Sequence, residues 1–411
     1  GFMRNKDNSH SGGGSGGGSG DLERPDVLRE IMELEHASTG ESGTNETSKP
    51  LDEVEDIITL PKFESMDHSL KLVSREKLEL SGTVLSELHT YVHTLATMYP
   101  ENPFHNFEHA SHVTMSVCKL LSRIVRPADI NVAENRDVAS TLHDHTYGIT
   151  SDPLTQFAVV LSALIHDVDH PGIPNTQLII EKPRLAEFYK NKSLAEQNSV
   201  DLAWTLLMDD GFTNLRGAIY GTPCEFKRFR QLIVNSVMAT DIMDKDLSTA
   251  RKTRWNQAFS DEIMDEKEQD NEADAVNRKA TIVIEHLIQA SDIAHTMQHW
   301  HIYRKWNGRL FEEMYKAFVD GRSPSNPADN WYQGEIGFFK FYIIPLAHKL
   351  KECGVFGVSG DEYLNYAVQN LREWELNGKN VVSGMVDTMK FKHVPKKVEK
   401  PKGDNASKPK S

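Results

Sequence analysis

Apolar side chains recur every three or four positions through most of the chain, with polar and charged residues between them. This spacing places them on one face of an amphipathic helix, because an α-helix has 3.6 residues per turn. We expect helices over residues 74–99, 113–125, 154–165, 195–208, 226–238, 280–293, 299–318, 337–351 and 361–375. No convincing strand pattern of period two appears between them. The sequence therefore predicts an all-α fold, a compact multi-helix bundle.

The two ends of the chain differ in composition from the rest. Residues 1–50 are rich in Gly, Ser and other polar residues, with a short amphipathic pattern around residues 27–34. Residues 392–411 are rich in Lys and Pro. Segments of this kind bury too little apolar surface to fold. We expect disorder over 1–50 and 392–411, and one folded domain over 51–391.

Charge and cysteine content narrow the class of protein. The chain has 411 residues, a formal net charge of -14 and three cysteines. An acidic surface repels phosphate backbones, which argues against bulk nucleic acid as a partner. Three cysteines without a CxxC pair indicate reduced thiols and a cytoplasmic setting. No apolar run approaches the roughly 20 residues that span a bilayer, so we expect no membrane segment in this chain. No pattern in the sequence identifies a regulatory partner.

Several histidines stand near carboxylates at positions that the helical pattern buries. His105 and His109 are four residues apart, a spacing that puts two imidazoles on one face of a helix. His166 and Asp167 end an apolar segment, and Asp292 lies within another. Buried charges are costly unless something neutralises them, and a metal ion would do so. His and carboxylate ligands suit Zn²⁺, Fe or Mn²⁺, and carboxylate with water suits Mg²⁺.

This combination suits hydrolysis of a phosphate ester. The Asp of an adjacent His-Asp pair can bridge two ions, which trap a hydroxide and polarise a phosphoryl oxygen. The leaving oxygen needs an acid, and His105 is placed for that role one turn from His109. A His pair alone is more often a surface feature, and residues 143–145, His-Asp-His in a loop-like stretch, show how easily such a dipeptide arises. The set of His109, His166-Asp167 and Asp292 is much harder to obtain by accident.

Short motifs resemble those of class I 3′,5′-cyclic nucleotide phosphodiesterases, a family of HD-type metal phosphohydrolases. Residues 105–110 look like its HNxxHA box, and residues 166–175 resemble its HDxxHxGxxN signature. Residues 239–241 resemble its ATD box, Asp292 matches its downstream metal aspartate, and residues 335–338 fall at its Q-x-x-F nucleotide clamp. The resemblance covers about residues 60–380.

The resemblance implies an all-helical catalytic domain with a binuclear metal site that converts cAMP or cGMP to the 5′-monophosphate. A Zn²⁺ would be held by His109, His166, Asp167 and Asp292. Asp167 would bridge to a second ion, usually Mg²⁺ and alternatively Mn²⁺, and a hydroxide between the ions would attack phosphorus. His105 would protonate the O3′ leaving group. Metal ligands and water would be oriented by His170, Asn175, Glu196 and Asp241. The purine would be sandwiched by Leu310 and Phe338, in a pocket that includes Glu335 and His295.

Four departures from the family pattern concern details around the site rather than the metal ligands. Glu335 replaces the glutamine of the clamp. An ionised carboxylate only accepts hydrogen bonds, which favours the N1–H and N2–H₂ donors of guanine over adenine, whose N1 is an acceptor. A protonated Glu335 would imitate glutamine and remove this preference for cGMP. The other departures are Gln197-Asn198-Ser199, His112 and His295, at positions where the family commonly has histidines, aspartate and asparagine.

Two other functions remain compatible with the sequence. The His and Asp set is shared with HD-type phosphohydrolases that act on other nucleotides. A non-catalytic cyclic nucleotide sensor is the second alternative, and Glu335 is the feature that favours it. The apparent acid His105 argues against a sensor, because binding alone needs no leaving-group acid.

Overall fold

The computed structural model describes residues 49–61, 79–124, 142–259 and 272–392. They all belong to the larger of two compact units, Asn45–Ser411. Every regular element in these ranges is helical, which confirms the all-α prediction. The possible helix at residues 27–34, the start of the first predicted helix and the two predicted disordered ends lie outside the described residues, apart from positions 49–50 and 392.

Each of the nine predicted segments overlaps at least one helix, and several helices were not predicted. The α-helices are α3 (Gly82–Met98), α4 (Phe107–Ser122), α6 (Pro153–Ile165), α7 (Asn175–Glu181), α8 (Pro183–Phe188), α9 (Leu194–Met208), α10 (Thr213–Ile219), α11 (Pro223–Met238), α12 (Lys245–Phe259), α13 (Glu272–Asp292), α14 (Trp300–Val319), α15 (Trp331–Phe338), α16 (Ile344–Glu352) and α17 (Val358–Lys392). The helices α7, α8 and α10 were not predicted because they are too short to show a clear apolar stripe. The helix α12 was not predicted because its buried side chains include two arginines, Arg251 and Arg254.

The single helix predicted over residues 337–351 is wrong in detail. The end of α15 runs into a π-helix, Phe339–Ile343, before α16 begins. Pro345 explains the interruption, because proline has no N–H to donate to the carbonyl of Phe341 and its ring clashes with that carbonyl in an α-helix. A wider π-turn relieves this clash, and such turns are frequent at functional sites.

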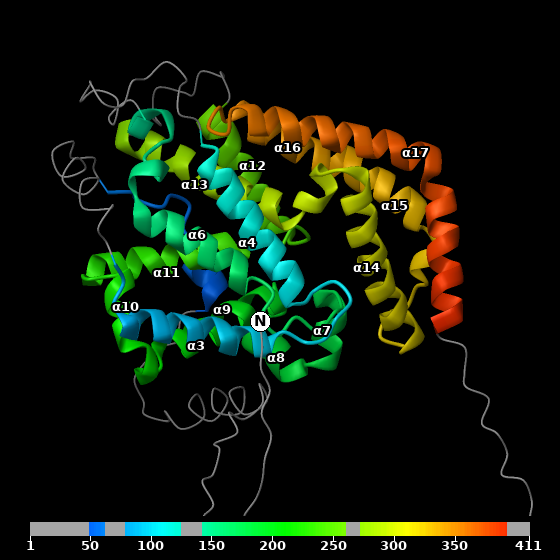
Figure 1. Cartoon of the computed structure of the whole chain (residues 1–411), viewed down its shortest axis with the longest axis horizontal. Helices are drawn as coiled ribbons and strands as arrows, with labels where there is room; N and C mark the ends of the chain where they lie inside the picture. The colour runs from blue at the N-terminus through cyan, green and yellow to red at the C-terminus, as the bar shows by residue number, and fades with distance from the viewer. Residues whose placement is uncertain (1–48, 62–78, 125–141, 260–271, 393–411) are drawn as a thin grey trace, which may run out of the picture. The chain divides into compact units, whose positions relative to one another are not determined.

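The last helix is longer than predicted. The sequence pattern indicated a helix over 361–375, whereas α17 continues to Lys392. Its later buried positions include Gly378 and Val382, and Leu376 and Phe391 are exposed, so the periodic signal weakens there. Figure 1 shows α17 along one edge of the unit, beside α14 and α15, and it packs against both.

Three helices bring the candidate site together. The strongly apolar α6 packs between α4 and α11, and α13 packs against α4 and α6. The end of α6, the start of α4 and the end of α13 therefore meet, and these are the places where His166, His109 and Asp292 stand. Residues 142–145, which include the His-Asp-His run expected in a loop, form one helical turn.

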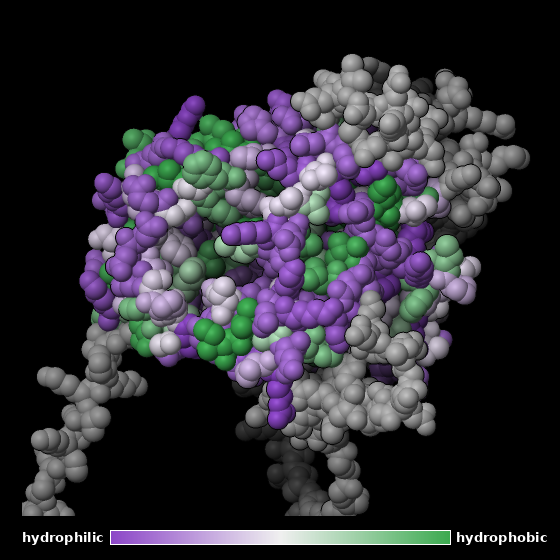
Figure 2. All heavy atoms as spheres, turned by 180° about the vertical axis from the view of Figure 1, so that it is seen from behind, coloured by the Kyte–Doolittle hydropathy of each residue, from purple (hydrophilic) through white to green (hydrophobic). Residues whose placement is uncertain are grey.

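On the side opposite to that of Figure 1, hydrophilic side chains predominate and apolar ones form separate small patches (Figure 2). Among the described residues, no helix combines the length and hydrophobicity needed to cross a membrane.

Candidate active site

Four predicted metal ligands converge from three separate segments. The Nε2 atom of His109 lies 3.1 Å from Oδ1 of Asp292 and 3.6 Å from Oδ2 of Asp167. The Nε2 atom of His166 lies 3.1 Å from Oδ2 of Asp167 and 3.4 Å from Oδ1 of Asp292. Ligand atoms of His109, His166 and Asp292 all lie within 4.8 Å of one another. This spacing can surround a single cation.

The chemistry of these groups fits a divalent ion. Nε2 of His166 and Oδ2 of Asp167 are buried and have no hydrogen-bond partner. Nδ1 of His166 lies 3.0 Å from the carbonyl of Ala163, a contact that leaves Nε2 available as a metal ligand. Burial alone would raise the pKa of Asp167, but nearby histidines, chiefly His166, hold that pKa well below its usual range. Asp167 is therefore ready to bind a cation, and orphaned buried groups of this kind are otherwise rare.

His105 stands beside this cluster but not on the helical face that the sequence suggested. The helix α4 begins after it, since Asn106 is the N-cap and its side chain accepts a hydrogen bond from the backbone N–H of His109 (3.0 Å). The His105 ring nevertheless lies 6.0 Å from the His109 ring and 3.9 Å from the His170 ring, centroid to centroid. Proximity to His109 is confirmed, but the backbone turn before α4 produces it, not an i,i+4 helical pair.

Glu313 holds His105 in place and was missed by the sequence analysis. Its Oε1 contacts Nδ1 of His105, and its Oε2 accepts the backbone N–H groups of Phe104 (2.9 Å) and His105 (3.0 Å). Burial alone would lower the pKa of His105, but Glu313 and then Asp167 outweigh it and raise that pKa to about 9. Glu313 lies on the buried stripe of α14, and an acidic residue in that stripe was the signal that could have revealed it.

The side chains predicted to orient the metal ligands and water make polar contacts with one another. Asn175 donates to Oε2 of Glu196 (2.9 Å) and accepts from the backbone N–H of Ala195 (2.9 Å). Burial, reinforced by Asp241, raises the pKa of Glu196 to about 8. Burial and the neighbouring His105 lower the pKa of His170 to about 4. Protonated Glu196 and neutral His170 can both donate and accept hydrogen bonds, as groups that orient water must.

The three residues after Glu196, which depart from the family pattern, all form hydrogen bonds within the protein. Asn198 donates to Oδ2 of Asp169 (3.2 Å), and the hydroxyl of Ser199 donates to the carbonyl of Val168 (2.8 Å). Gln197 accepts from the backbone N–H of Leu51 (3.2 Å). Two of these three side chains thus fix the segment that carries Asp167.

The proposed purine clamp is built on α14 and α15. Glu335 is buried, and the hydroxyl of Tyr303 donates to its Oε2 (2.6 Å). Burial raises the pKa of Glu335 to about 7, against the effect of this hydrogen bond. Phe338 ends α15 and stacks nearly parallel on Tyr342, with ring centroids 5.3 Å apart. Leu310 lies half-buried on α14.

His295 and His112 both lie near Trp306. His295 is buried in a short 3₁₀-helix between α13 and α14, with its ring 6.2 Å from Trp306. The His112 ring lies 5.2 Å from Trp306, and its Nε2 is 3.3 Å from Oε1 of Gln298. Burial, together with His109, lowers the pKa of both His112 and His295. Both rings are therefore neutral near pH 7 and add no positive charge to the pocket.

Comparison with known proteins identifies the family. The model of the 3′,5′-cyclic nucleotide phosphodiesterase family matches residues 104–354. This match covers more than half of the chain and includes every predicted site residue. The chain belongs to the 3′,5′-cyclic nucleotide phosphodiesterase family.

Individual relatives are distant and longer than this chain. It is 26% identical over 302 residues to the probable 3′,5′-cyclic phosphodiesterase pde-3 of Caenorhabditis elegans, covering 69% of this chain and 42% of that protein. It is 26% identical over 303 residues to the human dual specificity calcium/calmodulin-dependent 3′,5′-cyclic nucleotide phosphodiesterase 1C, covering 68% and 36%. The chain thus spans less than half the length of these relatives.

Solved structures support the fold. The phosphodiesterase domain of the Salpingoeca rosetta rhodopsin phosphodiesterase superposes with a TM-score of 0.56 at 21% identity, covering 79% of this chain and 89% of that one. At this identity the similarity concerns the arrangement of helices alone.

Proposed function

We propose that this chain hydrolyses a 3′,5′-cyclic nucleotide to the 5′-monophosphate. The observation that carries the proposal is the convergence of His109, His166, Asp167 and Asp292, with buried and unpartnered ligand atoms, beside a His105 held by Glu313. Family membership supplies the class of substrate. The catalytic unit corresponds to residues 51–391.

The four ligands would hold divalent ions, and their chemistry favours Zn²⁺ at the site of two histidines and two carboxylates. Asp167 would be shared with a second ion, Mg²⁺ or Mn²⁺, whose remaining ligands are water. When bound, the two ions would polarise a phosphoryl oxygen and make the attacking water more acidic. His170, Asn175, Glu196 and Asp241 would orient that water.

His105 would act as the general acid. The cyclic ester opens when the bond between phosphorus and O3′ breaks, and O3′ then needs a proton. Glu313 fixes one ring nitrogen of His105, so the other is the nitrogen that can face the substrate. The carboxylate also favours the protonated imidazole, which is the form that can donate.

Glu335 and Phe338 would recognise the purine, with Leu310 on the opposite face of the ring and His295 in the pocket wall. Stacking on Phe338 buries the flat base. Because Tyr303 occupies Oε2 of Glu335, Oε1 is the atom left for the base edge. In its ionised form Oε1 only accepts, and we propose a preference for cGMP, which offers two adjacent donors.

The decisive experiment measures hydrolysis of cAMP and cGMP by the metal-loaded protein and by His105→Ala and Asp292→Ala. We expect turnover of at least one cyclic nucleotide, and a loss of roughly 100-fold or more in each variant. Asp144→Asn is the matched control, because Asp144 lies in the other His-Asp dipeptide and is exposed.

Two outcomes would contradict this proposal. Tight binding of a cyclic nucleotide without turnover in excess Mg²⁺ would establish a sensor. Turnover restricted to nucleoside triphosphates or phosphomonoesters in a substrate panel would establish another HD-type phosphohydrolase.

A further inference from the structure

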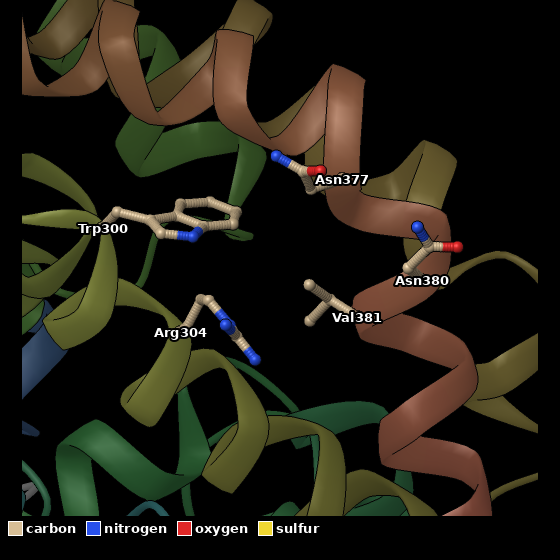
Figure 3. A pocket seen from close by; sticks show the side chains of 5 residues that line it. All are labelled: Trp300, Arg304, Asn377, Asn380 and Val381. Atoms are coloured by element: carbon tan, nitrogen blue, oxygen red, sulfur yellow. The ribbon is translucent and has the colours of Figure 1, made fainter.

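A cavity lined by residues of α14 and α17, none of them a candidate metal ligand, has the composition of a ligand site. It has a volume of about 360 Å³ and lies between the start of α14 and the second half of α17. Figure 3 shows Trp300 and Arg304 on one wall and Asn377, Asn380 and Val381 on the other, with their side chains around a common space. Pockets for small molecules begin at roughly 300 Å³, so this one is large enough for a ligand.

The lining is electropositive in an acidic protein. Arg304 is exposed, and within the described part of the chain no ion pair or hydrogen bond engages its guanidinium. No carboxylate lines the cavity. Glu373, which does not line the cavity, accepts one amide N–H of Asn377 (3.1 Å). A chain of net charge -14 thus presents a free cation at a concave site, which attracts an anion.

The other lining groups select a flat ring with a polar edge. The indole of Trp300 is half-buried, and a planar aromatic ligand gains by stacking on it. The amide of Asn380 offers one acceptor and two donors, the pattern that reads the edge of a nucleobase. Arg304 lies one helical turn from Trp300, and its guanidinium can bind two phosphate oxygens at once.

We propose that this cavity is a second, non-catalytic site for a nucleoside monophosphate, with the base on Trp300 and the phosphate on Arg304. The site uses none of the residues of the proposed reaction, so it does not depend on that reaction. The cavity is nevertheless connected to the proposed purine clamp through contacts between side chains. The Trp300 ring lies 5.4 Å from the ring of Tyr303, whose hydroxyl donates to Glu335.

The test measures binding of guanosine 5′-monophosphate to the full chain by calorimetry, after chelation to suppress metal-dependent binding of phosphate. We expect Arg304→Gln and Trp300→Leu each to weaken binding at this site by tenfold or more. Arg372→Gln is the matched control, because Arg372 is an exposed arginine of α17 outside the cavity and should leave affinity within twofold. Phe338→Ala, which alters the proposed catalytic pocket, should also leave it within twofold.

Three results would overturn the proposal. Loss of binding in Phe338→Ala but not in Arg304→Gln would place the nucleotide in the catalytic pocket. Equal loss in Arg304→Gln and Arg372→Gln would indicate a general charge effect. Inorganic phosphate binding as tightly as the nucleotide would leave an anion patch without recognition of a base. A protein that fails to hydrolyse cyclic nucleotides can still pass this test.

Discussion

At the scale of single residues, Glu313 has the most specific role that the sequence did not reveal. It fixes His105 from the side of Nδ1 and also accepts two backbone N–H groups. Glu313→Gln would keep the shape but remove the charge that favours protonated His105. We expect kcat to fall about 10- to 100-fold with little change in KM.

Glu312→Gln is the neighbouring control, because Glu312 pairs with Lys392 on the surface of α14. The double variant Glu313→Gln with His105→Ala should be no slower than His105→Ala alone, since the two residues act as a unit. An additive loss in the double variant would show that Glu313 acts on something other than His105.

Glu335 leads to a prediction about pH. Its pKa of about 7 means that the carboxyl is protonated below that pH and ionised above it. The protonated form both donates and accepts, as glutamine does, whereas the ionised form only accepts. We expect the ratio of kcat/KM for cGMP to that for cAMP to rise as pH increases through about 7. In Glu335→Gln this ratio should not vary with pH, and a parallel rise in that variant would rule out Glu335 as its source.

The same pKa has a consequence for stability. The native carboxyl keeps its proton up to a pH of about 7, whereas an unfolded Glu loses it near 4.5. The free energy of unfolding therefore falls as pH rises between these two values. Above pH 7, Glu335→Gln should be more stable than the parent by up to roughly 3 kcal/mol, and near pH 4 the two should be equal. Urea unfolding at several pH values measures the difference.

At the scale of elements, the N-cap of α4 connects stability to the site. The Asn106 side chain accepts from His109 N–H and donates to the carbonyls of Asn102 (2.8 Å) and Pro103 (3.3 Å). Asn106→Ala should cost about 1 kcal/mol of stability, as for other N-caps. It should also reduce kcat, because His105 and His109 flank this cap.

Thr222→Ala is the control that separates the loss of stability from a change in the geometry of the site. Thr222 caps α11 with a capping box, far in sequence from the metal ligands, and its loss should cost a similar free energy. Thermal unfolding and turnover of both variants make the comparison. If both variants lose activity equally, stability rather than site geometry explains the loss in Asn106→Ala.

The elements also show where sequence patterns are reliable. Long amphipathic stretches such as 154–165 and 299–318 were predicted well, because the buried faces of α6 and α14 are mainly apolar. The π-helix at 339–343 was not predicted, because hydrophobic periodicity reports which face is buried and not how the backbone passes Pro345. The extension of α17 was missed because Gly378 occupies a buried position without an apolar side chain.

At the scale of the whole molecule, the candidate metal ligands lie at the ends of α6 and α13 and near the start of α4. Ions bound there stabilise only the native state, in which all the ligands meet. Removal of metal by a chelator should lower the melting temperature, reflecting a loss of about 3 to 4 kcal/mol if the ions are normally present at 100 to 1,000 times their dissociation constants. Adding Zn²⁺ and Mg²⁺ back should restore it.

Asp292→Asn provides the control for this measurement. Its melting temperature should already be low and should respond little to the chelator. An unchanged melting temperature of the parent protein after verified metal removal would show that the ions do not bridge these helices.

The helical class, the candidate metal ligands and the candidate acid His105 could be predicted from the sequence, because these predictions depend on periodicity and on residue types at short spacing. His166 and Asp167 are adjacent in the chain, and His105 and His109 are four residues apart, so local order already constrains them. Only the tertiary structure decided how Asp292 and Glu313 reach these residues, because packing of α13 and α14 sets that proximity. Burial decided the pKa of Glu335, and the approach of α14 to α17 created the cavity at Trp300. These properties depend on which surfaces exclude water, and no local pattern along the chain records that.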